Sequence, residues 1–108
     1  MANPGTLHIK NGFTKPITIF VSLDGWNCCD APLPGQNVGY LEVNGTQDLP
    51  YLRKDGHSCD GKQGNFSLLI NSTMRVDLNF DSGGNMADPN PVGCNAGLSG
   101  QNVLIVSA

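Results

Sequence analysis

Glycine and proline interrupt this chain so often that long helices have little room to form. Fourteen glycines and seven prolines are spread over 108 residues, and both residue types destabilise helix interiors. Between these breakers, residues alternate with a period of two, as in a β-strand that buries one face. The alternation is clearest in residues 17–23 and 73–80. The chain is therefore expected to fold from strands.

The pattern predicts an all-β fold with a single domain spanning residues 1–108. Turns rich in glycine, proline, asparagine and aspartate separate the strand candidates. Seven strands are predicted: residues 6–10, 17–23, 38–43, 48–53, 66–70, 73–80 and 102–107. Short strands joined by such turns are typical of an antiparallel sandwich or barrel, and we expect a small antiparallel β-sandwich with disulfide-stapled loops. The connection over residues 82–100 is longer than the others, and such long loops are often functional or mobile.

Charge and hydropathy restrict the partners and the compartment. Only 14% of the residues are charged and the net charge is −3, so no basic run exists to bind nucleic acid. No run of about 20 apolar residues could span a membrane. The N-terminus lacks the apolar centre of a signal peptide. We expect either a mature secreted chain with a new start or a leaderless protein that oxidises outside the cell.

The four cysteines are expected to form structural disulfides. Cys28 and Cys29 are neighbours, whereas Cys59 and Cys94 lie far along the chain. Four cysteines allow three pairings, and a bond between neighbours strains the peptide. We therefore expect Cys28 and Cys29 each to reach a distant partner, with the choice between the two pairings left open. The alternative is a zinc site that uses the four cysteines and His57, but the C-x₂₋₄-C spacing typical of zinc knuckles is absent.

A glycine-rich segment offers a second type of metal site. Asp81, Asn85 and Asp88 place oxygen ligands on a flexible backbone, and oxygen is the ligand that calcium prefers. The spacing differs from that of an EF-hand loop, and a solvated turn is the competing interpretation. No cofactor other than calcium is expected.

No local motif indicates catalysis. His57 and Cys59 are two residues apart, but a cysteine in a disulfide cannot act as a thiolate nucleophile. The G-x-S-x-G motif of serine hydrolases is absent. A glycoside hydrolase needs two converging carboxylates, and nothing in the sequence marks such a pair. We expect a protein that is not an enzyme, with a small polysaccharide-acting enzyme that uses an aspartate pair as the remaining alternative.

The segment over residues 53–70 predicts a stapled loop that leads into a strand. Arg53 and Asp55 are placed to pair across the base of the loop, and Cys59 anchors its tip. The segment then continues as a strand whose alternate apolar side chains enter the core. Trp26 lies in a turn after the strand over residues 17–23, where it either caps the core or forms an amphipathic anchor at the loop end.

The same segment carries a family resemblance. Arg53, Asp55, Gly61, Gly64, Phe66 and Leu68 form the pattern R-x-D-x₅-G-x₂-G-x-F-x-L. This resembles the R-x-D-x₃-G-x₂-G-x-F-x-L stretch of the aegerolysins, with two more residues before the first glycine. The early segment LHIKNGFTKPITI is similar to the start of that family, and also to thaumatin-like domains and small insecticidal β-sandwich toxins. The tryptophan-rich second half of aegerolysins has no counterpart here.

The resemblance implies a small β-sandwich that recognises membrane lipids in defence or toxicity, sometimes with a larger pore-forming partner. We therefore expect a non-enzymatic, extracellular-type binding protein for a membrane lipid or a cell-surface glycan, in an oligomeric state that is left open. A lectin, dependent on calcium or not, is the alternative. The predicted ligand-binding residues are Asp24, Trp26, Tyr40, Arg53, Asp55 and His57.

Overall fold

All regular secondary structure in the described part of the chain is β-strand. The computed structural model describes residues 2–100 and 102–108, and these residues contain no helix long and apolar enough to cross a bilayer. The strands are β1 (Gly5–Asn11), β2 (Ile17–Val21), β3 (Cys29–Ala31), β4 (Asn37–Leu41), β5 (Thr46–Arg53), β6 (Gly64–Ile70), β7 (Met74–Phe80), β8 (Asn90–Val92), β9 (Asn95–Leu98) and β10 (Val103–Ser107). The predicted all-β class is confirmed.

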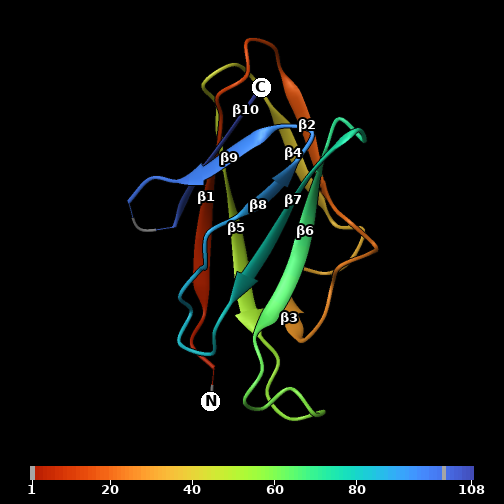
Figure 1. Cartoon of the computed structure of the whole chain (residues 1–108), viewed down its shortest axis with the longest axis vertical. Helices are drawn as coiled ribbons and strands as arrows, with labels where there is room; N and C mark the ends of the chain where they lie inside the picture. The colour runs from red at the N-terminus through yellow and green to blue at the C-terminus, as the bar shows by residue number, and fades with distance from the viewer. Residues whose placement is uncertain (1, 101) are drawn as a thin grey trace.

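The strands form two five-stranded sheets. The first sheet has the order β3-β5-β1-β10-β9, and the second has the order β4-β2-β6-β7-β8. Neighbouring strands are antiparallel except for β1 and β10, which run parallel. The expectation of a purely antiparallel arrangement is wrong at this pair, because the last strand is inserted beside the first in the same direction. The two chain termini accordingly lie at opposite ends of the long axis (Figure 1).

Inward-facing side chains of both sheets form one core. In β6, the predicted core residues Phe66, Leu68 and Ile70 are fully buried, and they pack in the same apolar cluster as side chains of β1, β5 and β10. The rings of Tyr51 and Phe80 meet edge to face with their centroids 4.7 Å apart, an arrangement that adds about 0.5–1.5 kcal/mol to the burial of the rings. The core that joins the two sheets is therefore built from residues at every second position of the strands.

All seven predicted strands occur, but the prediction missed three more. The missed strands β3, β8 and β9 have three or four residues each and lie at sheet edges. Strands this short show too little alternation to stand out, and β8 and β9 also contain Pro91 and Gly97, which are unfavourable in strand interiors. The segment over residues 82–100, expected to be one long connection, thus carries two of the ten strands.

Candidate functional site

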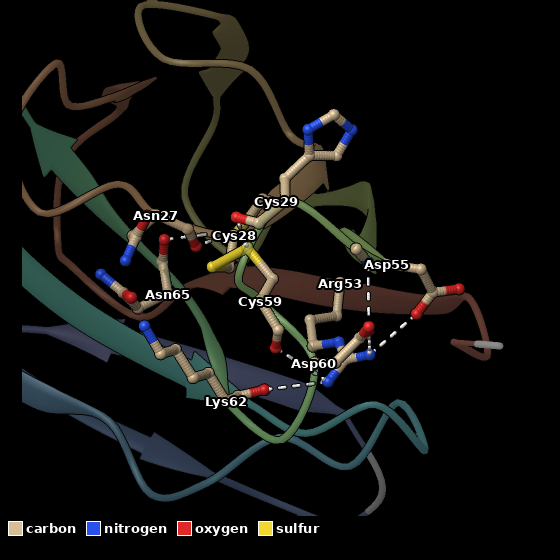
Figure 2. The surroundings of a disulfide bond; sticks show 11 residues. Asn27, Cys28, Cys29, Arg53, Asp55, Cys59, Asp60, Lys62 and Asn65 are labelled. Carbon is tan, nitrogen blue, oxygen red and sulfur yellow. Dashed lines mark hydrogen bonds and ion pairs between the residues drawn. A yellow bond between two sulfur atoms is a disulfide. The ribbon is translucent and has the colours of Figure 1, made fainter.

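The segment between β5 and β6, residues 54–63, forms a loop that a disulfide fastens to the rest of the fold. We call it the stapled loop. It projects beyond the strands at the end of the molecule where the N-terminus lies (Figure 1). The disulfide joins Cys59 in the loop to Cys28, which directly precedes β3 (Figure 2). The predicted stapled loop is therefore present.

Arg53 organises the stapled loop from within the protein. Its side chain is buried, with a relative exposure of 7%, and its Nη1 atom donates to the carbonyl oxygens of Cys59 at 3.3 Å and Lys62 at 3.1 Å. Its Nη2 atom donates to Asp55 Oδ1 at 2.8 Å (Figure 2), which confirms the predicted pairing of these two residues. Asp55 Oδ2 also accepts a hydrogen bond from the backbone N–H of Ala2 at 2.9 Å.

These contacts give Asp55 a structural role. The hydrogen bond from Arg53, followed by that from the Ala2 amide, lowers the pKa of the Asp55 carboxyl below its ordinary value. The ionised carboxylate thus ties the N-terminal segment to the base of the stapled loop. His57, by contrast, is exposed in the loop. Its backbone has a positive φ of 52°, between Gly56 and Ser58, which also have positive φ.

Only one of the two expected disulfides forms. Cys28 bonds to Cys59, whereas Cys29 and Cys94 are free thiols, so the expectation for Cys29 and Cys94 is wrong. The φ of 54° at Cys28 interrupts the extended chain. Cys29 then begins β3 with a buried side chain. Because Cys28 and Cys59 are bonded to each other, the four cysteines do not provide the ligands of the alternative zinc site.

The buried Cys29 thiol has no opportunity to act as a nucleophile. Its Sγ atom lies 3.3 Å from the carbonyl oxygen of Asn27 and 3.4 Å from that of Asn65. Burial raises the pKa of the thiol to about 11, so it stays protonated at neutral pH. A protonated thiol is a poor nucleophile and a poor metal ligand.

The candidate calcium residues are brought together only in part. Asn85 donates to Asp81 through its backbone N–H at 2.9 Å and its side-chain amide at 3.2 Å. These hydrogen bonds lower the pKa of Asp81 and occupy both of its oxygens. Asp88 is exposed and makes no hydrogen bond to either residue, and no group of three or more His, Cys, Asp or Glu side chains within residues 2–100 and 102–108 is placed to hold a metal ion. The segment therefore behaves as a hydrogen-bonded turn.

Of the remaining predicted ligand-binding residues, Asp24 and Trp26 lie in the loop after β2, and Tyr40 lies in β4. Trp26 is half-buried and packs against the core, while its indole N–H donates to the carbonyl oxygen of Pro32 at 2.7 Å. Asp24 is exposed beside it, and Tyr40 is exposed on β4. Trp26 and Asp24 flank Gly25, which lines a hollow on the surface of the second sheet.

A polar hollow lies over β6, β7 and β8, and we take it as the candidate functional site. Its volume is about 260 Å³. The lining includes three amides, one hydroxyl and one pair of opposite charges, together with one glycine and two apolar side chains. The polar hollow is lined by Gly25, Asn65, Phe66, Ser67, Arg75, Asp77, Leu78, Asn79 and Asn90.

Strand register explains why these polar groups meet. Ser67 in β6 faces Asp77 in β7, and Asp77 faces Asn90 in β8, so that one row of polar residues crosses three strands. Asn65 faces Asn79 in a second row on the same strand pair. In both strands these residues alternate with the buried apolar residues of the core. The polar hollow is therefore the solvent side of the same alternation that builds the core.

The acidic group of the polar hollow is held in its ionised form. Asp77 Oδ1 accepts hydrogen bonds from Ser67 Oγ at 2.5 Å and from Arg75 Nε at 2.6 Å. Partial burial alone would raise the pKa of Asp77, but the hydrogen bonds from Ser67 and Arg75 and the charge of Arg75 outweigh burial and lower the pKa. Asp77 is thus a hydrogen-bond acceptor at neutral pH.

Gly25 covers one side of the polar hollow at close range. A Cβ atom at this position would lie 2.7 Å from Ser67 Oγ and 2.8 Å from Arg75 Nη2, and the φ of Gly25 is 69°. Both the space and the backbone conformation favour glycine. The Asn65 side-chain amide donates to the Gly25 carbonyl at 2.7 Å, which holds this loop over the sheet.

A second hollow is less suited to binding a polar ligand. It has a volume of about 310 Å³ and lies over β9 and β10. It has no charged side chain in its lining, which consists of Asn95, Ala96, Gly97, Leu98, Ser99, Ile105 and Ser107. Since charged groups form the stronger hydrogen bonds, the polar hollow is the better candidate.

The polar hollow was not among the features predicted from the sequence. Its signal was present as polar residues at the alternate positions of residues 64–70 and 74–80, but their meeting depends on the register between the two strands. In comparisons with known proteins, no protein family and no curated protein matches the chain.

Proposed function

We propose that this protein is a non-enzymatic, extracellular-type β-sandwich that binds a cell-surface glycan in the polar hollow. The carrying observation is the concentration of hydrogen-bonding groups around a cavity of about 260 Å³. Sugars are recognised through many hydroxyl groups, each of which needs a donor or an acceptor. Ionised Asp77 supplies an acceptor, Arg75 supplies donors, and the asparagine amides supply both.

The chemistry of the polar hollow supports binding over hydrolysis. Asp77 is the only carboxylate among the lining residues, and no histidine or cysteine lines the cavity. Glycoside hydrolysis by the usual mechanisms needs a second carboxylate as acid, base or nucleophile. The lowered pKa of Asp77 also opposes a role as general acid at neutral pH.

The Cys28–Cys59 disulfide supports a secreted or leaderless extracellular location, since such bonds persist in oxidising compartments. The resemblance of residues 53–68 to aegerolysins supports a role in toxicity or defence, in which a second, pore-forming protein is one candidate partner. The predicted ligand-binding residues His57, at the stapled loop, and Tyr40, on β4, are both exposed and do not line the polar hollow.

A membrane lipid is the second candidate ligand, because two leucines are exposed on adjoining loops. Leu23 and Leu33 have relative exposures of 78% and 58%, and Leu23 lies close to Gly35. The loops that carry them are joined by the hydrogen bond from Trp26 to Pro32. Exposed apolar side chains of this kind can enter the interfacial region of a bilayer.

A glycan array and liposome co-sedimentation, run on the same preparation, test these proposals. We expect binding to a set of glycans that is unchanged by a calcium chelator, because Asp77 is the only carboxylate that lines the polar hollow. Loss of binding with chelator would instead favour a calcium-dependent lectin that uses Asp81 and Asp88. Sedimentation with sugar-free phospholipid vesicles, abolished in a variant with Leu23→Ser and Leu33→Ser, would favour the lipid. Failure to bind on both platforms would refute both ligands.

A further inference from the structure

The charged pair in the polar hollow leaves one side of each partner free. Ser67 and Arg75 both donate to Asp77 Oδ1. Asp77 Oδ2 accepts no hydrogen bond from the residues that the structure describes, and the Nη atoms of Arg75 donate none to those residues. The two side chains are partly exposed, with relative exposures of 39% for Asp77 and 38% for Arg75. The ion pair in the lining of the polar hollow therefore keeps an acceptor on Asp77 and donors on Arg75 that make no hydrogen bond to the described residues.

We propose, on the basis of the glycan-binding function above, that the polar hollow recognises two adjacent hydroxyl groups of an uncharged sugar. One hydroxyl donates to Asp77 Oδ2, and its neighbour accepts from an Nη atom of Arg75. Both hydrogen bonds involve an ionised protein group, which makes them stronger than bonds between neutral groups. Because the hydrogen bond between Arg75 and Asp77 already holds the two side chains together, little further ordering is needed when the sugar binds.

The charge of the polar hollow favours a neutral ligand. Arg75 and Asp77 are its only charged lining residues, and their charges cancel at a separation of 2.6 Å between Nε and Oδ1. A carboxylated or sulfated sugar would be attracted by Arg75 but repelled by Asp77 at almost the same distance. On binding it would also lose part of its hydration shell, and no net electrostatic attraction would compensate for that loss. A neutral vicinal diol matches both groups at once.

The absence of a side chain at Gly25 allows the donors of Arg75 to face the ligand. Because a Cβ atom there would approach Ser67 Oγ to 2.7 Å and Arg75 Nη2 to 2.8 Å, any larger residue would displace the guanidinium or raise the loop. Asn79 and Asn90 border the same space and offer amide groups to further hydroxyls of the sugar. The preference for a vicinal diol thus depends on Asp77 and Arg75, and the amides of Asn79 and Asn90 provide additional contacts.

The test combines a glycan array with titration calorimetry on the full chain. The array includes neutral, sialylated and sulfated glycans, and the calorimetric probes are the methyl glycoside of the preferred terminal sugar and its monodeoxy analogues. We expect neutral glycans to be preferred. Removal of either of two adjacent hydroxyls should weaken binding at least tenfold, whereas removal of a distant hydroxyl should have a smaller effect.

Variants assign the contacts to the polar hollow. Asp77→Asn and Arg75→Met should each weaken binding at least tenfold, and Gly25→Ala should weaken it severalfold. Asp48→Asn, which changes an exposed carboxylate on β5 in the other sheet, should leave binding unchanged. Thermal melting confirms that each variant is folded, and the deoxy-sugar series needs no variant.

The possible failures are distinguishable. A preference for sialylated or sulfated glycans, or binding that tolerates the loss of every single hydroxyl, would overturn the diol proposal and leave glycan binding intact. Glycan binding that survives both Asp77→Asn and Arg75→Met would place the site elsewhere and overturn the diol proposal as well. No binding to any glycan on the array would refute the proposed function itself.

Discussion

Ser67 and Asp77 face each other directly across β6 and β7, and the Ser67 hydroxyl donates to Asp77 Oδ1 at 2.5 Å. Ser67 is buried, although it belongs to the row of polar residues that lines the polar hollow. Its hydroxyl therefore exchanges water for a carboxylate, which is the stronger acceptor. This hydrogen bond links β6 and β7, the two longest strands of the second sheet, within the lining of the polar hollow.

This relationship predicts how stability depends on pH. The pKa of Asp77 is lower in the folded protein than the ordinary aspartate value of 3.8. Its stabilising contribution is therefore complete above about pH 5 and is lost as the pH falls through the lower folded-state pKa. Urea denaturation of the native protein and of Asp77→Asn should show a larger difference in unfolding free energy at pH 6 than at pH 3. Equal differences at both pH values would show that these hydrogen bonds do not hold the carboxylate ionised.

A second prediction concerns the buried guanidinium of Arg53. Arg53→Met should lower the unfolding free energy by roughly 2–3 kcal/mol, because the carbonyl oxygens of Cys59 and Lys62 lose a charged donor. Chemical denaturation gives this value directly. Lys62→Met is the matched control, since the Lys62 side chain is exposed and the Arg53 bond uses its backbone. A comparable loss in both variants would argue against the specific role of Arg53.

The core can be tested with two phenylalanines of opposite exposure. Phe66 is fully buried and Phe20 has a relative exposure of 41%. Phe66→Ala should destabilise the protein by about 3–5 kcal/mol, because the deleted ring leaves a cavity between the sheets. Phe20→Ala should cost about 1 kcal/mol or less. If thermal and urea unfolding showed the reverse order, the assignment of the buried face of the second sheet would be wrong.

The alternation of residues predicted the part of the fold in which burial on one face is strict. Apolar residues such as Val76, Leu78 and Phe80 recur at every second position, and this repeat is visible without knowing which strand lies beside them. The edge strands gave no such signal, because a strand such as β8 has only three residues and its burial pattern has no fully buried position. The parallel pairing of β1 and β10 could not be predicted from the sequence either, since it depends on the path of the whole chain.

The site was less predictable than the fold for a related reason. Arg53 and Asp55 are two residues apart, so their pairing could be predicted from local geometry. Ser67 and Asp77 are ten residues apart and meet only because of the register set by the turn between β6 and β7. Gly25 comes from a third segment, and its role becomes visible only when the space around it is known.

The cysteines give a prediction in which adjacent residues behave differently. Ellman titration of the denatured, unreduced protein should find two thiols per chain, which belong to Cys29 and Cys94. In the native protein Cys94 should react first, since it is only partly buried, whereas burial raises the pKa of Cys29 to about 11. Cys94→Ser should reduce the count to one. A count of zero would indicate a second disulfide, and a count of four would contradict the Cys28–Cys59 bond.

The last prediction concerns the bond that fastens the stapled loop. Cys28 and Cys59 are separated by 31 residues in the sequence, and cross-linking a loop of this size should restrict the unfolded chain by about 3–4 kcal/mol of free energy. The double variant with Cys28→Ser and Cys59→Ser should therefore lose about that much stability in urea denaturation at neutral pH. Cys94→Ser, a matched change at a cysteine that makes no disulfide, should cost less than about 1 kcal/mol. Arg53 still bonds the carbonyl oxygens of the loop in the double variant, so the folded state keeps a hydrogen-bonded loop, and the loss measures mainly the release of the unfolded chain. A loss no larger than that of Cys94→Ser would mean that the disulfide does not constrain the unfolded chain.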